Sequence, residues 1–353
     1  MSFFMKNLAV PLMLFVFAFS LCAENQINDN PLMTRYLMQK RALDKEKFFL
    51  FDVGASGGIA SYWKFFGKSL VGVGFDPLVS ECERLNKINQ FSGFIYEPSY
   101  IVSEITEIDQ YTNKIINCPI YERSSSRYYL NNFKIDYTKQ FLNHDADCLY
   151  TEKRISLDRY CLENKIKNVD FIKTDTDGAD YAVLRGAEKL LQNGNILGLY
   201  VECNFHGEAH PYAKSFRNID RFLVENGFTL FDLSTVRYTK AQLPGKFLFN
   251  HPAQTFTGQI VWGDALYLKD FVFMKNQGKE IPNSQIIKMA CLQEIFGLPD
   301  CAAELLVTFR DQLANDIDVD RCLDALTEDM GLYRNYNKHV GRFRTNRQAF
   351  FSK

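Results

Sequence analysis

The sequence lacks an excess of charge of either sign. Lys and Arg number 41 and Asp and Glu number 42, which gives a formal net charge of -1. A protein that recruits nucleic acid through its overall field is usually strongly basic, with its cations gathered on one face. The composition therefore argues against a nucleic acid partner, and we expect none.

The sequence also lacks paired cysteines. Its 9 cysteines include no C-x-x-C pair and no zinc-like spacing, so neither a disulfide framework nor a structural zinc site is indicated. We expect most of them to be reduced core residues. Internal repeats and low-complexity tracts are absent too, while 46% of the residues are hydrophobic. That composition is typical of a folded globular chain with a sizeable core.

The N-terminal residues 1–23 differ from the rest of the chain. Lys6 is followed by an uncharged run from Leu8 to Ala23, which Pro11 interrupts. The run is short for a membrane-spanning helix, so it is read as a signal peptide or a short anchor. Residues 8–23 therefore predict membrane association or export.

Residues 24–47 are polar and predict a linker with a helix around Pro31 to Lys45. From Phe48 an alternation of apolar runs and helical periodicity begins, which is typical of an α/β domain over residues 48–275. The candidate strands are Phe48–Val53, Leu70–Phe75, Gly93–Tyr96, Val169–Thr174, Ile196–Val201, Thr229–Leu233 and Ala265–Phe273. Residues 282–353 predict a small helical appendage, with helices at Ser284–Phe296, Asp300–Leu313 and Asp318–Met330 and a solvated basic tail.

A glycine-rich turn ends the first candidate strand. The segment from Phe51 to Gly58 reads F-D-V-G-A-S-G-G, and Asp76 ends the next apolar run. Glycine lets the backbone approach a cofactor closely, and a carboxylate at the end of the second strand can accept two hydrogen bonds from a ribose diol. The spacing is not the full G-x-G-x-x-G, which argues against a dinucleotide and favours a nucleotide cofactor without a pyrophosphate, such as S-adenosylmethionine.

A second cluster follows two later strands. Asp175, Asp177 and Asp180 come after the strand that ends at Thr174, and Glu202, His206 and His210 follow the next one. In open parallel sheets ligands lie beyond the carboxyl ends of the strands. Asp177 and Asp180 can equally be helix-capping residues. Asp175, Glu202 and one histidine are candidates for catalysis or, alternatively, for binding a divalent metal.

The order of these motifs resembles the FkbM family. The resemblance rests on Phe51-Asp52-Val53-Gly54-Ala55, Gly74-Phe75-Asp76-Pro77, Ile155-Ser156-Leu157-Asp158, the segment from Asp170 to Asp180, and Val183-Leu184-Arg185-Gly186-Ala187, and it covers roughly Phe48 to Phe273.

Members of that family are S-adenosylmethionine-dependent methyltransferases, generally assigned to O-methylation of sugars or natural products. The resemblance implies a Rossmann-like, seven-stranded sheet of the class I methyltransferases, with helices on both faces and an antiparallel last strand. It further implies that cofactor-binding residues are Asp52, Gly54, Ala55, Gly57 and Asp76. Asp175 and Glu202 would line the methyl-transfer site, and His206, Asp175 or His210 would take the proton from a saccharide or other small-molecule hydroxyl.

The N-terminal run conflicts with this activity, because S-adenosylmethionine is a cytosolic metabolite and an exported enzyme would lack its donor. The run indicates membrane association or export, whereas the donor indicates catalysis in the cytoplasm. Two alternatives therefore stay open. One is a metal-dependent hydrolase that uses Asp175, Glu202, His206 and His210 as ligands. The other is a non-enzymatic, exported binding module that keeps the fold.

Overall fold

The structure is a computed structural model of the 353-residue chain. It describes residues 27–117, 149–193, 195–207, 209–239, 254–329 and 334–351, together with Leu243, Lys246 and Leu248. The predicted signal or anchor segment, residues 1–23, lies outside these ranges.

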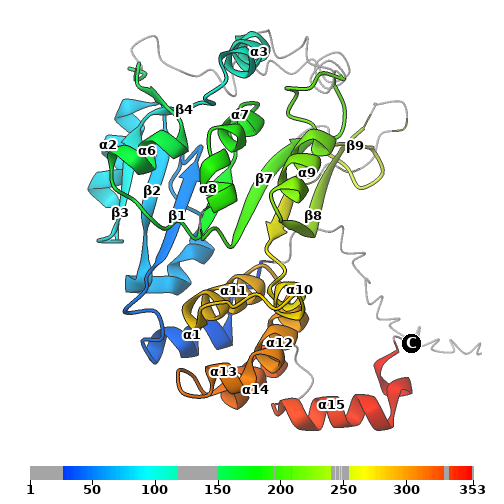
Figure 1. The fold of residues 1–353 in the computed structure, drawn as a ribbon. Coiled ribbons are helices and arrows are strands. Elements are labelled where there is room, and N and C mark those ends of the chain that lie inside the picture. The colour runs from blue at the N-terminus through cyan, green and yellow to red at the C-terminus, as the bar shows by residue number, and fades with distance from the viewer. Residues whose placement is uncertain are drawn as a thin grey trace, which may run out of the picture.

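A seven-stranded sheet forms the centre of the molecule (Figure 1). Its strands are β1 (Phe48–Val53), β2 (Leu70–Asp76), β3 (Phe94–Pro98), β6 (Phe171–Thr174), β7 (Gly198–Asn204), β8 (Thr229–Tyr238) and β9 (Gln259–Leu268). The strand order is β3-β2-β1-β6-β7-β9-β8, and only β9 runs antiparallel to its neighbours. A separate two-stranded sheet joins β4 (Tyr100–Ile101) to β5 (Arg154–Ile155). The predicted methyltransferase-like sheet with an antiparallel last strand is thereby confirmed.

The central strands are apolar because both faces of the sheet are covered. The strand β1 reads F-F-L-F-D-V and is buried at every position except Phe49, which is partly buried. A parallel strand that is covered on both sides reads as a continuous apolar run rather than an alternating one. The carboxyl ends of the five parallel strands β3, β2, β1, β6 and β7 thus emerge together at one edge of a dry sheet.

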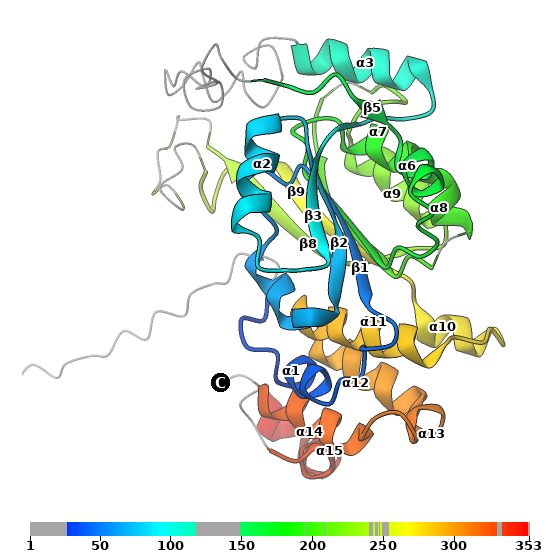
Figure 2. The same ribbon diagram turned by 90° about the vertical axis from the view of Figure 1, so that its left-hand side faces the viewer.

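Helices cover the two faces of the sheet, as Figure 2 shows. On one side lie the 3₁₀ helix η1 (Ser61–Ser69) and α2 (Val79–Ile88); on the other lie α6 (Leu157–Glu163), α7 (Asp180–Arg185), α8 (Glu188–Asn193) and α9 (Phe216–Glu225). The helix α3 (Thr106–Asn117) lies above the carboxyl ends of the strands in both views. The prediction of helices on both faces is confirmed.

The remaining helices form a lobe beneath the amino ends of the strands (Figure 1). They are α1 (Leu32–Gln39), α10 (Phe271–Asn276), α11 (Asn283–Ile295), α12 (Pro299–Thr308), α13 (Arg310–Leu313), α14 (Val319–Asp329), α15 (Tyr336–Thr345) and the 3₁₀ helix η3 (Arg347–Phe350). Among the described residues, no helix is long and apolar enough to span a membrane. The six cysteines that lie in the described ranges are all free thiols, as expected.

Buried polar contacts tie this helical lobe to the sheet domain. The ammonium of Lys288 on α11 lies 2.9 Å from both carboxylate oxygens of Asp170, which precedes β6, and Asp170 also accepts a hydrogen bond from the backbone N–H of Phe49. Glu294 is fully buried and accepts from the backbone N–H groups of Met33 and Thr34 at the start of α1. One hydrophobic cluster also runs from the η1 side of the sheet into the lobe. The C-terminal helices are therefore continuous with the core of the sheet domain.

Among the predicted elements whose bounds differ in the structure, two end earlier than expected. The predicted strand Ala265–Phe273 is wrong at its end, because β9 stops at Leu268 and α10 begins at Phe271. Asp270 causes the switch: its side chain accepts a hydrogen bond from the backbone N–H of Phe273 and caps the helix. The predicted helix around Pro31 to Lys45 ends earlier, since α1 stops at Gln39.

We predict that Lys288→Met lowers the free energy of unfolding by about 3 kcal/mol or more, because the Asp170 carboxylate is left buried and without its cation. Urea denaturation of the full chain measures this change. Lys279→Met, at an exposed lysine before α11, is the control and should shift stability by less than about 0.5 kcal/mol. Equal denaturation midpoints for the two variants would contradict the proposed role of the ion pair.

Candidate active site

The predicted site residues meet at the carboxyl edge of the sheet. Val53 pairs with Phe75 in β2 and with Thr174 in β6. Gly54 follows β1, Asp76 is the last residue of β2, and Asp175 follows β6, so the three residues lie at the ends of adjacent strands. Further along the same edge, Glu202 of β7 pairs with Asp264 of β9. Two clusters that are far apart in the sequence therefore share one edge.

The turn after β1 requires glycine. Gly54 has φ +85°, and a Cβ at this position would lie 1.8 Å from the carbonyl oxygen of Asp175. The backbone N–H groups of Gly54 and Ala55 both donate to the carbonyl of Phe75, at 2.9 and 3.0 Å. Only a residue without a side chain lets the turn pass this close to both neighbouring strands. The result is a tight backbone cradle between β1, β2 and β6.

The other predicted cofactor-binding residues lie around this cradle. Asp76 is buried at the end of β2, and its Oδ1 accepts a hydrogen bond from the backbone N–H of Leu78 at 2.8 Å. Ala55 is buried and Gly57 is exposed, with φ +81° and open space where a Cβ would point. The side chain of Asp52 is buried beneath the turn.

Lys173 connects the carboxyl ends of β1 and β6. The ammonium of Lys173 on β6 lies 3.2 Å from Oδ1 of Asp52 and 3.4 Å from Oδ2 of Asp175, and it donates to the carbonyl of Gly54 at 3.3 Å. Burial raises the pKa of Asp52 to about 6 against the effect of Lys173. Burial lowers the pKa of Lys173, but the carboxylates of Asp52 and Asp175 outweigh it, so the net shift is upward. Asp175 is 54% exposed, so this carboxylate is the accessible member of the group.

A second lysine lies between two further carboxylates. Lys214 is buried, and its ammonium is 2.9 Å from Oδ2 of Asp180 and 2.7 Å from Oε2 of Glu202. One cation cannot neutralise two buried carboxylates. The pKa of Asp180 is lowered by Lys214, whereas burial, together with the nearby Asp180 carboxylate, raises the pKa of Glu202 to about 8. Glu202 is therefore the carboxyl group of this pair that holds a proton near neutral pH.

Asp264 and Tyr62 complete the cluster. Asp264 faces Glu202 across the β7–β9 pairing, and burial followed by the negative charge of Asp175 raises its pKa to about 7. Tyr62 on η1 lies within electrostatic reach of the carboxylates of Asp52, Asp175 and Asp264, which add to burial in raising its pKa. The edge thus holds more carboxyl groups than cations, and two of these carboxyl groups titrate close to neutral pH.

The two predicted histidines occupy different surroundings. His206 is partly buried in the turn after β7, and burial lowers its pKa. The ring of His210 stacks on Tyr111 of α3 with centroids 4.0 Å apart, and its Nδ1 accepts from the backbone N–H of Tyr212. His210 therefore holds α3 against the loop that delivers Lys214.

A cavity of about 240 Å³ lies beneath α3. Asp109, Thr112 and Asn113 of α3 line it from above, and Ala179 and Ala182, at the start of α7, line it from the side of the acidic cluster. The ring of Tyr100 and the guanidinium of Arg154 also face it, with the Arg154 guanidinium carbon 4.8 Å from the ring centroid. The cavity is therefore lined by an aromatic ring and by hydroxyl, amide and carboxyl groups.

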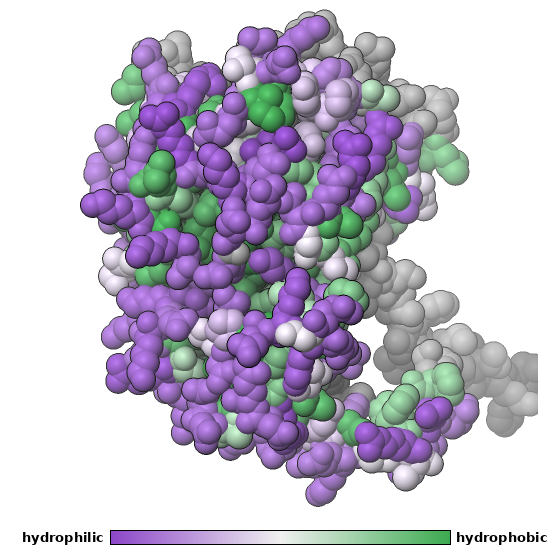
Figure 3. Space-filling view, viewed as in Figure 1, coloured by the Kyte–Doolittle hydropathy of each residue, from purple (hydrophilic) through white to green (hydrophobic). Residues whose placement is uncertain are grey.

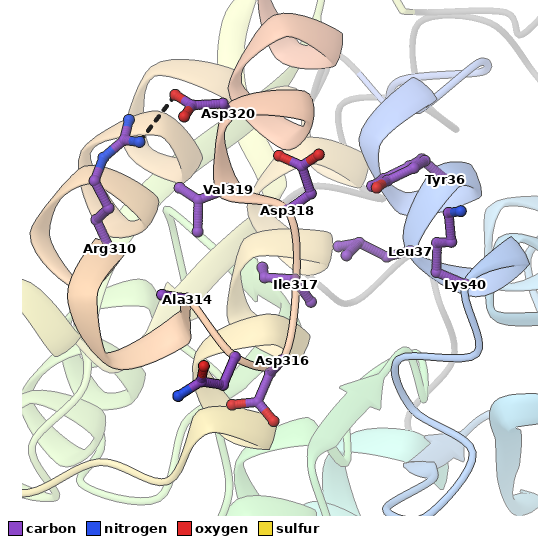
Figure 4. A pocket seen from close by; sticks show the side chains of 11 residues that line it. Tyr36, Leu37, Lys40, Arg310, Ala314, Asp316, Ile317, Asp318, Val319 and Asp320 are labelled. Carbon is purple, nitrogen blue, oxygen red and sulfur yellow. Dashed lines mark hydrogen bonds and ion pairs between the residues drawn. The ribbon is translucent and has the colours of Figure 1, made fainter.

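A larger cavity of about 640 Å³ lies in the helical lobe, away from the strand ends (Figure 4). Figure 4 shows Arg310 paired with Asp320 on one side of it and Tyr36 and Lys40 of α1 on the other. Its acidic residues Asp316 and Asp318 belong to the loop before α14 and Asp320 to the first turn of that helix, and Asp318 accepts from the backbone N–H of Arg321. These contacts are those of a helix-capping loop.

The described residues offer no set of ligands for the alternative metal site. Within the described ranges, no group of three or more His, Cys, Asp and Glu side chains converges as metal ligands do. Asp175 forms an ion pair with Lys173 and Glu202 forms one with Lys214. The ring of His210 stacks on Tyr111. The described residues therefore do not assemble the metal site on which the hydrolase alternative depends.

Sequence reasoning missed four members of the cluster. Lys173 lies in the segment from Asp170 to Asp180, between buried residues of β6. A lysine in an otherwise apolar strand indicates a buried partner of opposite charge. Lys214 and Tyr62 lie in segments without periodicity, and Asp264 lies in a strand whose antiparallel pairing to β7 was not assigned residue by residue. Only the three-dimensional pairing brings these residues to Asp175 and Glu202.

We predict that the folded chain loses stability as the pH rises through the pKa of Asp264. Because burial raises this pKa from 3.8 to about 7, the folded state binds a proton that the unfolded state has released, and stability falls between those two values. Asp264→Asn should reduce the difference in unfolding free energy between pH 5 and pH 8 by about 2 kcal/mol. Denaturant titrations at both pH values measure it, with Asp232→Asn as control. An unchanged pH dependence in Asp264→Asn would contradict the proposed burial of this carboxyl group.

Comparison with known proteins gives a family match and several similar solved structures. The Methyltransferase FkbM domain matches residues 52–230. No curated protein sequence matches the chain. Similar solved structures include a SAM-dependent methyltransferase from Aquifex aeolicus, with 12% identity, a TM-score of 0.29, and coverage of 68% of this chain and 94% of that one. Another is a TehB-like SAM-dependent methyltransferase from Corynebacterium glutamicum, with 10% identity, a TM-score of 0.26, and coverage of 67% and 88%.

The family match spans the glycine turn, Asp76, Lys173, Asp175 and Glu202, and it ends before β9. The chain belongs to the FkbM methyltransferase family, and its cofactor is S-adenosylmethionine.

Proposed function

We propose that the chain is an O-methyltransferase that acts on a hydroxyl group of a saccharide or glycoconjugate. The observation that carries the proposal is the cluster of carboxyl groups at the ends of β6, β7 and β9, next to the glycine cradle. S-adenosylmethionine supplies a methyl group on a positively charged sulfonium, which leaves as a neutral thioether. A hydroxyl acceptor must lose its proton in the reaction, so a nearby group has to take it.

The residues at the edge fit this cofactor. The cradle at Gly54 lets a ligand approach the backbone, and the buried carboxylate of Asp76 would accept hydrogen bonds from the ribose diol. The carboxyl groups outnumber Lys173 and Lys214, so the field at the edge favours a cation. A sulfonium is such a cation, and its charge would also help to keep the surrounding carboxyl groups ionised.

The proton acceptor would be one of the two carboxyl groups that titrate near neutral pH. A general base works best when its pKa lies near the working pH, and Asp264 at about 7 and Glu202 at about 8 meet that condition. Lys214 orients Glu202 through a 2.7 Å contact, whereas burial and nearby charges set the pKa of Asp264. Asp264 is therefore the better candidate for the base, and Glu202 for positioning.

The acceptor would enter through the cavity beneath α3. Its volume of about 240 Å³ is of the order of one sugar ring, and it offers the ring of Tyr100 beside the polar side chains of Asp109, Thr112 and Asn113. Aromatic faces and hydrogen-bonding side chains are what a sugar needs for stacking and orientation. This lining supports a polyol acceptor over an apolar one.

We predict that S-adenosylmethionine binds the full chain and that Asp76→Ala weakens binding at least about 10-fold, because hydrogen bonds to a charged acceptor are lost. Isothermal titration calorimetry measures the dissociation constant. Asp232→Ala, at an aspartate in the edge strand β8, is the control and should bind like the wild type. A chain that is folded by circular dichroism yet binds no S-adenosylmethionine would favour the non-enzymatic binding module.

We predict that Asp264→Asn lowers kcat for methyl transfer about 100-fold or more while leaving the dissociation constant of S-adenosylmethionine within about threefold. The assay transfers a labelled methyl group to a panel of saccharides, amines and carboxylates. A methyl ether on a saccharide is the expected product, and the rise of kcat with pH near 7 should be lost in the variant. Labelling of amines or carboxylates alone would contradict O-methylation of a hydroxyl.

A further inference from the structure

The last part of the described chain is basic and exposed. Residues 334–351 contain no Asp and no Glu. The cations of this segment are Arg334, Lys338, Arg342, Arg344 and Arg347. No residue of α15 is buried, although the other helices of the lobe that exceed eight residues contribute to the core. The segment thus concentrates positive charge on a chain whose formal net charge is -1.

The start of the helix α15 is held to the lobe by contacts with α14. The backbone N–H of Tyr336 donates to Oδ1 of Asp324 on α14, and the ring of Tyr336 packs against the core cluster. Beyond this point the helix extends from the lobe, as Figure 1 shows. Lys338, Arg342 and Arg344 make no ion pair with any residue in the described ranges. These three cations are therefore available to a partner outside the chain.

Apolar side chains accompany the cations. Tyr336, Val340 and Phe343 recur at positions i, i+4 and i+7 and so share one face of α15. Phe343 is 45% exposed and meets Phe350 edge to face, and Phe351 is 67% exposed. In the space-filling view, hydrophilic and hydrophobic residues lie side by side on this projecting end of the molecule (Figure 3).

We propose that α15 and η3 dock on an anionic phospholipid membrane surface. A helix that carries Lys and Arg on its polar side and Phe on the other lies in the interface of a bilayer, where phosphate groups meet the cations and the rings enter the acyl boundary. The phosphates of a nucleic acid would match the cations, but they would offer no apolar contact to the exposed rings of Phe343 and Phe351. The mixture of cations and aromatic rings therefore favours the membrane.

The position of the chain's other end supports this partner independently. The apolar run from Leu8 to Ala23, which predicts membrane association, precedes the first described residue. The described chain starts on the same helical lobe, where the backbone N–H of Asn28 donates to the carbonyl of Ile295 on α11. The first described residues and α15 thus both belong to the lobe beneath the amino ends of the strands. The candidate active site, at the opposite edge of the sheet, would face away from the bilayer.

The test measures binding of the full chain to vesicles of phosphatidylcholine, with and without about 30% phosphatidylserine, by co-sedimentation. The charge variant is Lys338→Gln with Arg342→Gln and Arg344→Gln. Each cation near an anionic surface contributes about fivefold to binding, so the expected loss is roughly 100-fold on the anionic vesicles. The control replaces Lys68, Lys87 and Lys167 by Gln; these exposed lysines on the sheet domain give the same change in net charge.

A second pair of variants tests the aromatic contribution. Phe343→Ser should weaken binding to anionic vesicles about tenfold, because one buried ring is lost from the interface. Phe273→Ser, at an exposed phenylalanine of α10, is the matched control and should bind like the wild type. Circular dichroism of each variant confirms folding, and methyltransferase activity in solution should not change.

Three results would overturn the proposal. One is equal binding of the wild type to neutral and anionic vesicles, which would leave residues 8–23 as the sole attachment. Another is an equal loss of binding in the α15 charge variant and its lysine control. The third is tighter binding to a short DNA duplex than to anionic vesicles at equal phosphate concentration, which would make nucleic acid the partner of this helix.

Discussion

The ion pairs of two lysines hold the candidate active site together. Lys173 joins the carboxylates of Asp52 and Asp175, and Lys214 joins those of Asp180 and Glu202. Each lysine meets two carboxylates, so the centre keeps more acid groups than cations. Burial then pushes the remaining groups, Glu202 and Asp264, to pKa values of about 8 and 7. Removing either lysine would leave uncompensated charge in a dry environment, and the arrangement of the strand ends depends on avoiding that cost.

This imbalance connects the fold to the chemistry. A cluster with too few cations attracts a positive ligand and stores a proton when that ligand is absent. S-adenosylmethionine would bring the missing positive charge to the site, and in the proposed O-methylation the hydroxyl of the acceptor would release the proton that a carboxylate takes. The same excess of acid that costs stability in the free chain would therefore serve both cofactor binding and proton removal in the proposed reaction.

The local pattern of the sequence predicted the sheet and the cofactor-binding residues around the glycine turn. Continuous apolar runs located the parallel strands, and the glycine turn and Asp76 stood out because strand ends of this kind carry ligands. Local pattern could not place Lys214, which comes from an irregular loop, or Asp264, which reaches the site only through the antiparallel register of β9. It also could not show that His210 stacks on Tyr111, since that contact joins segments about a hundred residues apart.

The helical lobe packs against the amino ends of the strands and stabilises the sheet domain. Its helices share a hydrophobic cluster with the sheet, and the Lys288–Asp170 pair closes the junction at the amino end of β6. The loops at the opposite edge are thereby free to form the site and its cover, α3. In the orientation that we propose, the lobe with α15 would contact the membrane on one side and the acceptor would enter from the other.

The most direct test of the central claim is a crystal structure of the full chain with S-adenosylhomocysteine. We expect the ribose hydroxyls at the Asp76 carboxylate, the amino acid end of the ligand at the Gly54 turn, and the sulfur on the side of Asp175, Glu202 and Asp264. A ligand bound elsewhere, or a strand-end site left empty at saturating ligand concentration, would contradict the assignment of this edge as the methyl-transfer site.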